Sequence, residues 1–340
     1  MNPASPEIDL LDEEPVFPES ETGQRRNLDY LGYAPCPVRA EMRRQMHRYF
    51  RAQRPAGVGE PRWFVPSSCH DANVYDGLWQ TEDESALPGL ISEVGFGDFN
   101  RPQFIRRWLD SGAFEAISDD EVRLEFSEAG LVDAKKIHRV IGANIEVVLV
   151  DLKRLGNRPL PKTWADILHP RFKHDIVISG EEGDIHESFL FGLHKDHGEG
   201  ALVALGANVS NFMHPAEMAK TAGTENPKGA ALYILPWFFA QSSPRRELTK
   251  IVWPEEGAYL SPLYLFRKRS ARPEAKLVQD FLLGKSWAAH LAKIGLAPAR
   301  VGSPALPGKL RWLGWDYVRN HDLEAMRAPL NAAFVRGRRG

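Results

Sequence analysis

Both cysteines of this chain, Cys36 and Cys69, follow segments that are predicted to be β-strands. Cys36 lies between a predicted first strand at residues 28–33 and a helix predicted over 38–53, and Cys69 follows a strand predicted at 63–65. Ligands of open parallel sheets bind beyond the carboxyl ends of the strands and near helix N-termini. We therefore expect both thiols at one ligand-facing edge of a sheet.

The chemistry of these thiols favours metal binding. Thiolate and imidazole groups suit zinc, copper(I) or iron, and a helix N-terminus lowers a thiol pKa. We predict a bound transition metal or metal-containing cofactor, of open identity, with Cys36, Cys69 and His186 as ligands. Because C-x-x-C spacing is absent, the alternative is that both cysteines are small buried hydrophobes.

A second alternative is a cysteine-dependent enzyme in which Cys36 or Cys69 is the nucleophile and His70 or His186 is the base. Neither a nucleophile elbow nor a caspase- or papain-type signature supports that alternative. The sequence therefore predicts a binding protein without catalytic residues.

Other polar and aromatic side chains are expected at the same edge. The additional predicted ligand-binding residues are Ser67, Ser68, Asp98, Glu181, Asp184, Glu187 and Trp237. Four of them have a structural alternative: a turn for the two serines, core filling for Trp237, and capping for Asp184. Asp184 would cap a helix that begins near His186, with Glu187 at the third helical position.

The elements that position these residues alternate between strand and helix. Residues 145–150 (IEVVLV) and 175–179 (DIVIS) have the β-branched, apolar composition of buried strands. The turn at 180–184 (GEEGD) then leads into the helix near His186. This alternation predicts an α/β fold with parallel strands.

Residues 142–193 also carry a resemblance to a known family. Their pattern of an apolar strand, D-x-K-x-L, P-K-T-W-A-D-I-L-x-P-x-F-K and a second strand resembles type II periplasmic-binding proteins, in particular the ferric-iron group of ABC-transporter solute-binding proteins. The matching residues are Asp151, Lys153, Leu155, Leu160, Pro161, Trp164, Asp166, Leu168, Pro170, Phe172 and Lys173. Residues 249–258 and 273–294 resemble two further segments of that family.

The resemblance implies a two-lobed fold with a mixed sheet in each lobe and a hinge of crossing strands. The expected parts are an acidic tail at 1–26, lobe 1 at 27–145 plus 251–297, and lobe 2 at 146–250 plus 298–335. The ferric-iron members use two adjacent tyrosines after the strand expected here at 230–235. This chain has Pro236-Trp237 instead, so that iron site is not expected.

Composition narrows the function further. The 340 residues carry a formal net charge of −2, which predicts neither nucleic acid nor an anionic membrane as a partner. No run approaches the ~18 apolar residues of a membrane span. The N-terminal residues lack a basic and apolar leader pattern, which predicts a cytoplasmic location, or a periplasmic one if a leader precedes this sequence.

These observations predict a solute-binding protein that carries a metal ion, metallo-cofactor or oxyanion between its lobes. It would act as a cytoplasmic carrier or sensor, with an ABC permease or a cofactor-dependent protein as partner.

Overall fold

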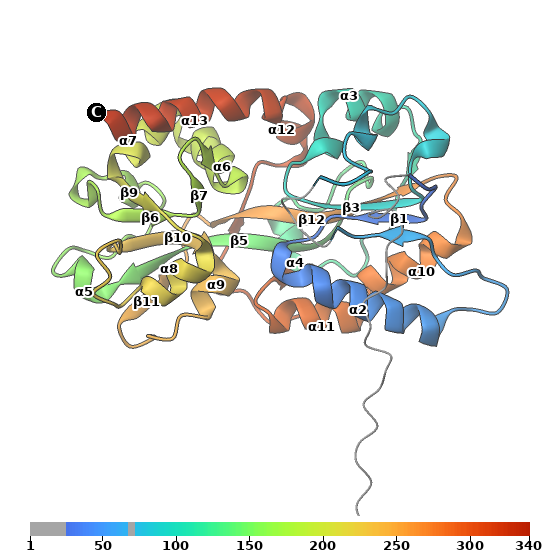
Figure 1. Cartoon of the computed structure of the whole chain (residues 1–340), viewed down its shortest axis with the longest axis horizontal. Helices are drawn as coiled ribbons and strands as arrows, with labels where there is room; N and C mark the ends of the chain where they lie inside the picture. Colours follow the sequence, from blue (N-terminus) through green and yellow to red (C-terminus); the bar gives the residue numbers. More distant parts are fainter. Residues whose placement is uncertain (1–24, 67–71) are drawn as a thin grey trace, which may run out of the picture.

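The computed structural model describes residues 25–66 and 72–340, except for the side chain of Cys36. Two α/β lobes lie side by side and are joined at the centre by two long strands, β5 (Arg139–Asp151) and β12 (Ala258–Lys268) (Figure 1). Each lobe has its own sheet with helices on both faces (Figure 1). The arrangement matches the predicted two-lobed α/β fold with crossing strands.

Strand β5 belongs to both sheets, since its two halves pair with different neighbours. Residues 139–145 pair antiparallel with β12, whereas residues 146–150 pair antiparallel with β10 (Leu232–Pro236). All thirteen β5 residues are buried, which explains the nearly continuous apolar composition of its second half. Each lobe is thus fixed to one half of the same strand.

The lobe 1 sheet has the order β2–β1–β3–β12–β5. Its other strands are β1 (Tyr30–Gly32), β2 (Trp63–Phe64) and β3 (Leu90–Val94), which pair in parallel. One face is covered by α2 (Cys36–Gln53), α10 (Pro273–Leu282) and α11 (Lys285–Lys293) (Figure 1). Val38, Met42, Met46 and Phe50 of α2 recur at helical spacing and are buried there, as the sequence predicted.

The lobe 2 sheet has the order β5–β10–β6–β9, with β6 at Ile176–Ile178 and β9 at Val209–Phe212. One face carries α6 (Glu187–His197), α7 (Glu199–Asn208) and α13 (Leu323–Arg339), and the other carries α8 (Pro215–Thr221) and α9 (Trp237–Gln241) (Figure 1). Helices α7 and α13 approach closely because Gly206 faces the backbone of Phe334 and Gly337 faces that of Val203.

Shorter elements complete the described fold: α3 (Pro102–Phe104), a π-helical turn (Ile105–Leu109), β4 (Phe114–Glu115), α4 (Leu124–Glu128), α5 (Leu152–Leu155), β7 (Gly180–Glu181), β8 (Asp184–Ile185), β11 (Thr249–Val252), β13 (Ala297–Pro298), β14 (Leu310–Arg311) and α12 (Trp315–Asn320). Short 3-10 turns lie at 78–80, 84–86, 98–100, 166–168 and 170–172. Among the described residues, no helix combines the length and apolar character that are needed to cross a lipid bilayer.

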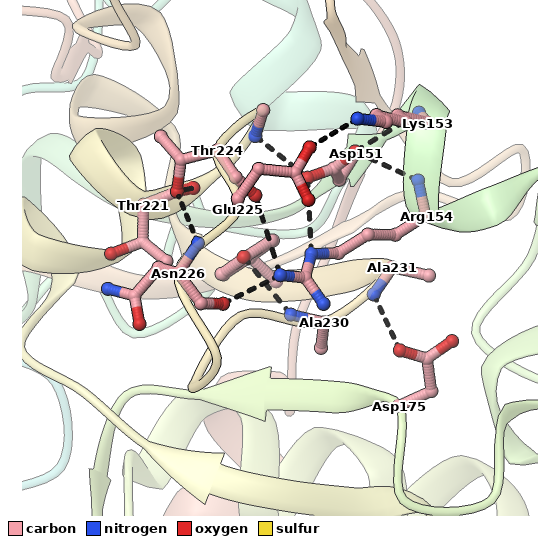
Figure 2. Close-up of polar contacts among 12 residues, drawn as sticks. Asp151, Lys153, Arg154, Asp175, Thr221, Thr224, Glu225, Asn226, Ala230 and Ala231 are labelled. Carbon is pink, nitrogen blue, oxygen red and sulfur yellow. Dashed lines mark hydrogen bonds and ion pairs between the residues drawn. The ribbon is translucent and has the colours of Figure 1, made fainter.

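The D-x-K-x-L segment of the family resemblance performs a structural task (Figure 2). The Asp151 side chain accepts hydrogen bonds from the backbone N–H groups of Lys153 (3.1 Å), Arg154 (3.0 Å) and Gly223 (2.8 Å). It thereby caps α5 and fastens the loop after α8 to the end of β5. The Arg154 guanidinium donates to the Asn226 carbonyl at 2.6 Å and holds the same loop.

The final segment returns to both lobes. In α12, Arg319 pairs with the buried Asp133, which also lies 3.2 Å from the His138 ring at the start of β5. Trp315 of α12 stacks on that ring at 4.1 Å. Burial lowers the pKa of His138 to about 4, so the ring is neutral at neutral pH. Contacts of α12 therefore run to the lobe 1 side of β5, whereas α13 packs on lobe 2.

Candidate ligand-binding cleft

A cavity of about 360 Å³ lies between the lobe 1 strand ends and helix α13. Its polar lining includes Tyr33, Arg39, Glu93, Asp98, Glu324 and Arg327. Tyr33 follows β1, and Arg39 lies in α2, the helix after it. Glu93 lies in β3 and Asp98 follows that strand. Glu324 and Arg327 come from α13, which packs on lobe 2. The cavity thus occupies the position that is expected for a ligand, between the lobes and beyond the strand ends.

Glu93 is a buried acid in this cavity. Its carboxyl group accepts a hydrogen bond from the Tyr264 hydroxyl at 2.7 Å and lies 3.3 Å from the Asn100 amide nitrogen. Burial raises the pKa of Glu93 to about 8, and these hydrogen bonds offset only part of that rise. At neutral pH the group is therefore largely protonated and can both donate and accept hydrogen bonds.

The two lobes touch through Glu187, the first residue of α6. Its carboxylate accepts a hydrogen bond from the Phe96 N–H of lobe 1 at 2.9 Å and pairs with Arg327 of α13 at 2.9 Å. Gly95, with a φ of 77°, lets the lobe 1 chain pass against this carboxylate, because a Cβ at that position would overlap it. Glu187 therefore makes a direct contact between the two lobes.

The crossing strands form a polar floor beside this contact. Asn144 and Glu146 of β5 and Ser261 of β12 are 7%, 1% and 2% exposed. The Asn144 carbonyl oxygen, both Glu146 carboxyl oxygens and the Ser261 hydroxyl have no hydrogen-bond partner. Burial raises the pKa of Glu146, and the His186 imidazole, 3.3 Å away, opposes that rise.

The predicted binding residues occupy several places. Asp98 lines the cavity and pairs with Arg101 at 2.6 Å. His186 lies beside Glu146 of the strand floor, and Glu187 contacts Phe96 of lobe 1. Glu181 lies exposed on the hairpin of β7 and β8.

Asp184 and Trp237 lie apart from the cavity lining. Asp184 does not cap α6, because Gly180 and Gly183 form a β-hairpin that places Asp184 in β8 and leaves His186 as the residue before the helix. It is 3.9 Å from Arg327. Trp237 packs edge-to-face on Trp253, with 5.5 Å between the ring centroids.

The sulfur ligands cannot be placed from this structure. Ser67, Ser68, Cys69 and the Cys36 side chain lie outside the described residues, although the backbone makes Cys36 the first residue of α2, two residues before the predicted start of that helix. Among the side chains that are described, no group of three or more His, Cys, Asp or Glu is arranged to hold a metal ion. The prediction of Cys36, Cys69 and His186 as metal ligands stays a prediction.

Sequence reasoning missed several residues of the cleft: Tyr33, Arg39, Glu93, Asn144, Glu146, Ser261, Glu324 and Arg327. One signal was present in the sequence. Asn144 and Glu146 interrupt an otherwise apolar run and share its spacing of two, so that both point to one face of a central strand. A charged residue such as Glu146 is rarely buried without a partner, so its position in this apolar run could have indicated the polar floor.

The fold and the cleft together define a two-lobed solute-binding protein. A family model described as "Bacterial extracellular solute-binding protein" matches residues 85–321, and the chain belongs to that family. None of the curated proteins matches the sequence.

Solved structures show the same fold at low sequence identity. The apo ferric ion-binding protein A of Pasteurella haemolytica is 13% identical with a TM-score of 0.64, over 91% of this chain and 98% of that one. Apo FutA2 from Synechocystis is 14% identical with a TM-score of 0.62, over 92% and 99%. The spermidine/putrescine ABC transporter substrate-binding protein PotD of Streptococcus pneumoniae is 11% identical with a TM-score of 0.57, over 92% and 100%.

Proposed function

We propose that this protein captures one small polar solute between its lobes and that Glu187 helps to hold the lobes closed. The observation that carries this proposal is the Glu187 carboxylate, which joins Phe96 of lobe 1 to Arg327 of α13 beside the cavity. The Phe96 contact breaks if the lobes separate, so it favours the closed arrangement, whereas the Arg327 pair lies within lobe 2 and holds the carboxylate from that side. The cavity volume of about 360 Å³ lies at the lower end of the ~300–1,000 Å³ of small-molecule pockets.

The partner in this proposal is an ABC permease, as the family membership implies. Closure of the lobes changes the surface that such a permease meets, and this change lets it distinguish the loaded protein from the empty one. A cytoplasmic place of action, as carrier or sensor, stays a prediction from the sequence.

A transition metal is the second candidate ligand. In its favour, α2 begins at Cys36 directly after the β1 loop that contributes Tyr33 to the cavity, and His186 lies beside Glu146 in the cleft. Cys69 and Cys36 would complete this metal site. An oxyanion, the third predicted class, would have to replace Glu187 at the Phe96 N–H and Arg327.

Native mass spectrometry with metal analysis, on protein that is purified without oxygen, tests these candidates together. We expect one small adduct per chain that is lost on denaturation, and a metal signal only if Cys36 and Cys69 act as ligands. A Cys36→Ser, Cys69→Ser double variant should then lose the metal. The matched control is Glu115→Gln, since Glu115 pairs with Arg267 at 2.7 Å and lies outside the cavity lining.

Closure itself is tested by small-angle X-ray scattering of the wild type and the Glu187→Ala variant. We expect a larger radius of gyration for the variant without solute and a return toward the wild-type value when the adduct is restored. A radius of gyration that neither the substitution nor any bound solute changes would contradict the proposal.

A further inference from the structure

Three buried side chains of the crossing strands, beside the contact between the lobes, have polar atoms that make no hydrogen bond. Folded proteins pair nearly all such groups, because an unmade hydrogen bond leaves the full cost of desolvation uncompensated. At Asn144, Glu146 and Ser261, four polar atoms lack a partner at once. A concentration of this kind on one strand pair indicates a binding site and not an isolated packing fault.

All three side chains lie on the same face of the crossing strands. Asn144 and Glu146 are two residues apart on β5, and Ser261 of β12 is the direct antiparallel partner of Asn144. That face is turned toward the interlobe contact. His186, before α6, lies 3.3 Å from Glu146, and the Cβ position of Gly95 is 3.7 Å from that of Ser261.

The unpartnered atoms are mainly acceptors. Asn144 offers a carbonyl oxygen, Glu146 offers two carboxyl oxygens, and Ser261 offers a hydroxyl that accepts as well as donates. A buried carboxylate needs a positive charge or several N–H donors to become stable. The fitting ligand group therefore carries several N–H donors and a positive charge.

We propose that Asn144, Glu146 and Ser261 form a subsite for an ammonium or guanidinium group of the solute. This inference rests on the proposed solute-binding function and specifies the ligand class of the same cleft. The His186 imidazole lies 3.3 Å from Glu146 and 3.0 Å from the Ser188 hydroxyl. Because α6 and the Glu146 half of β5 belong to lobe 2, the part of the floor that separation of the lobes would uncover is Asn144 and Ser261, which pair in the lobe 1 sheet.

The neighbouring contact complements this subsite. Phe96 N–H and Arg327 already hold the Glu187 carboxylate, so these two donors are used within the protein. In the neighbouring cavity, Arg39 keeps one guanidinium nitrogen, Nη1, without a partner. At the strand floor itself the unpartnered atoms are acceptors, and they favour a cationic group over an oxyanion.

Isothermal titration calorimetry with simple probes tests the subsite. The probes are butylammonium, 1,4-diaminobutane and methylguanidinium, compared with glutarate, inorganic phosphate and Zn²⁺ alone. We expect at least one of the amine or guanidine probes to bind, and Glu146→Gln to weaken that binding at least about 30-fold through loss of a charge-assisted hydrogen bond. Ser261→Ala should weaken it about 5-fold, and Glu115→Gln should leave it unchanged.

Circular dichroism and the unfolding midpoint of each variant show that it is folded before titration. The subsite is excluded if none of the amine or guanidine probes binds, or if they bind equally well to folded Glu146→Gln. Tight binding of phosphate, glutarate or Zn²⁺ together with such a result would reject only the subsite and keep the solute-binding function. Failure of the function itself shows separately, as the absence of an adduct and of any change in the radius of gyration.

Discussion

Strand β5 carries two buried acidic residues, Glu146 and Asp151, that differ in their surroundings. Each is 1% exposed. Asp151, at the end of the strand, accepts three backbone hydrogen bonds and caps α5 (Figure 2). Glu146, in the middle, has no hydrogen-bond partner for either carboxyl oxygen.

The difference separates a structural carboxylate from a ligand-binding one. Backbone N–H groups from α5 and from the loop after α8 solvate Asp151, so its burial is compensated within the protein. Glu146 lies where the two lobes meet, and the His186 imidazole, 3.3 Å away, makes no hydrogen bond to it. A binding site must leave part of its hydrogen-bonding capacity open, at some cost in the stability of the empty protein.

The largest expected effect of a substitution is at Asp151. Asp151→Ala leaves three N–H groups without their acceptor, which should lower the free energy of unfolding by about 3–5 kcal/mol. Asp151→Asn keeps an acceptor for Lys153 and Arg154 and should cost about 1–2 kcal/mol. Urea denaturation measures both values, and a loss below 1 kcal/mol for the alanine variant would remove the contrast with Glu146.

Glu93 is an intermediate case, because it is buried and has partners but lines the cavity. Its folded pKa of about 8 lies above the ordinary value of 4.5, so the folded state keeps a proton that the unfolded state loses. Stability should therefore fall as the pH rises through this window, by ~1 kcal/mol per pH unit. The pKa of His138 is lowered from its ordinary value of 6.5 to about 4, so this residue makes the stability rise with pH between those two values.

The two effects roughly cancel between pH 4.5 and 6.5, and the decline due to Glu93 should be visible from about pH 6.5 to 8. The Glu93→Gln variant lacks this decline. The unfolding free energy of the variant minus that of the wild type should therefore rise by about 2 kcal/mol across that window. Denaturation curves at four pH values measure the difference. Parallel pH profiles would show that Glu93 is ionised in the folded protein.

Substitution of Glu146 by an apolar residue should change stability in the opposite direction to Asp151→Ala. Glu146→Leu removes a buried carboxyl group that accepts no hydrogen bond and should leave stability unchanged or raise it by about 1 kcal/mol, while solute binding is lost. Thermal unfolding of the solute-free protein is the measurement, with Glu115→Gln as control. If Glu146→Leu destabilises the protein as much as Asp151→Ala does, then Glu146 is a structural residue.

The smallest expected effect concerns the contact between Glu187 and Arg327, which are 17% and 29% exposed. A double-mutant cycle with Glu187→Gln and Arg327→Gln should give a coupling energy of about 0.5–1 kcal/mol, because solvent screens the pair. Because both residues belong to lobe 2, a coupling near zero would show that the pair contributes nothing to the packing of α13 on α6.

Much of the fold was predictable from local patterns. The apolar run before Asp151 and a helix over 38–53 were predicted and are confirmed, and that helix begins two residues earlier than predicted, at Cys36. The two lobes and the family followed from the segments around Asp151 and Trp164. The capping role offered as the alternative for Asp184 is not found, because two glycines with positive φ values form a hairpin there, and ligand binding by Asp184 stays a prediction.

The sequence by itself determined the strands, the helices and the class of binding protein, because these depend on residue periodicity and on short motifs. Only the tertiary structure decided which polar groups are satisfied. Ser261 meets Asn144, and Phe96 meets Glu187, across long stretches of chain. Whether a buried carboxylate finds a donor depends on such distant segments, so Asp151 and Glu146 look alike in the sequence and differ in the folded protein.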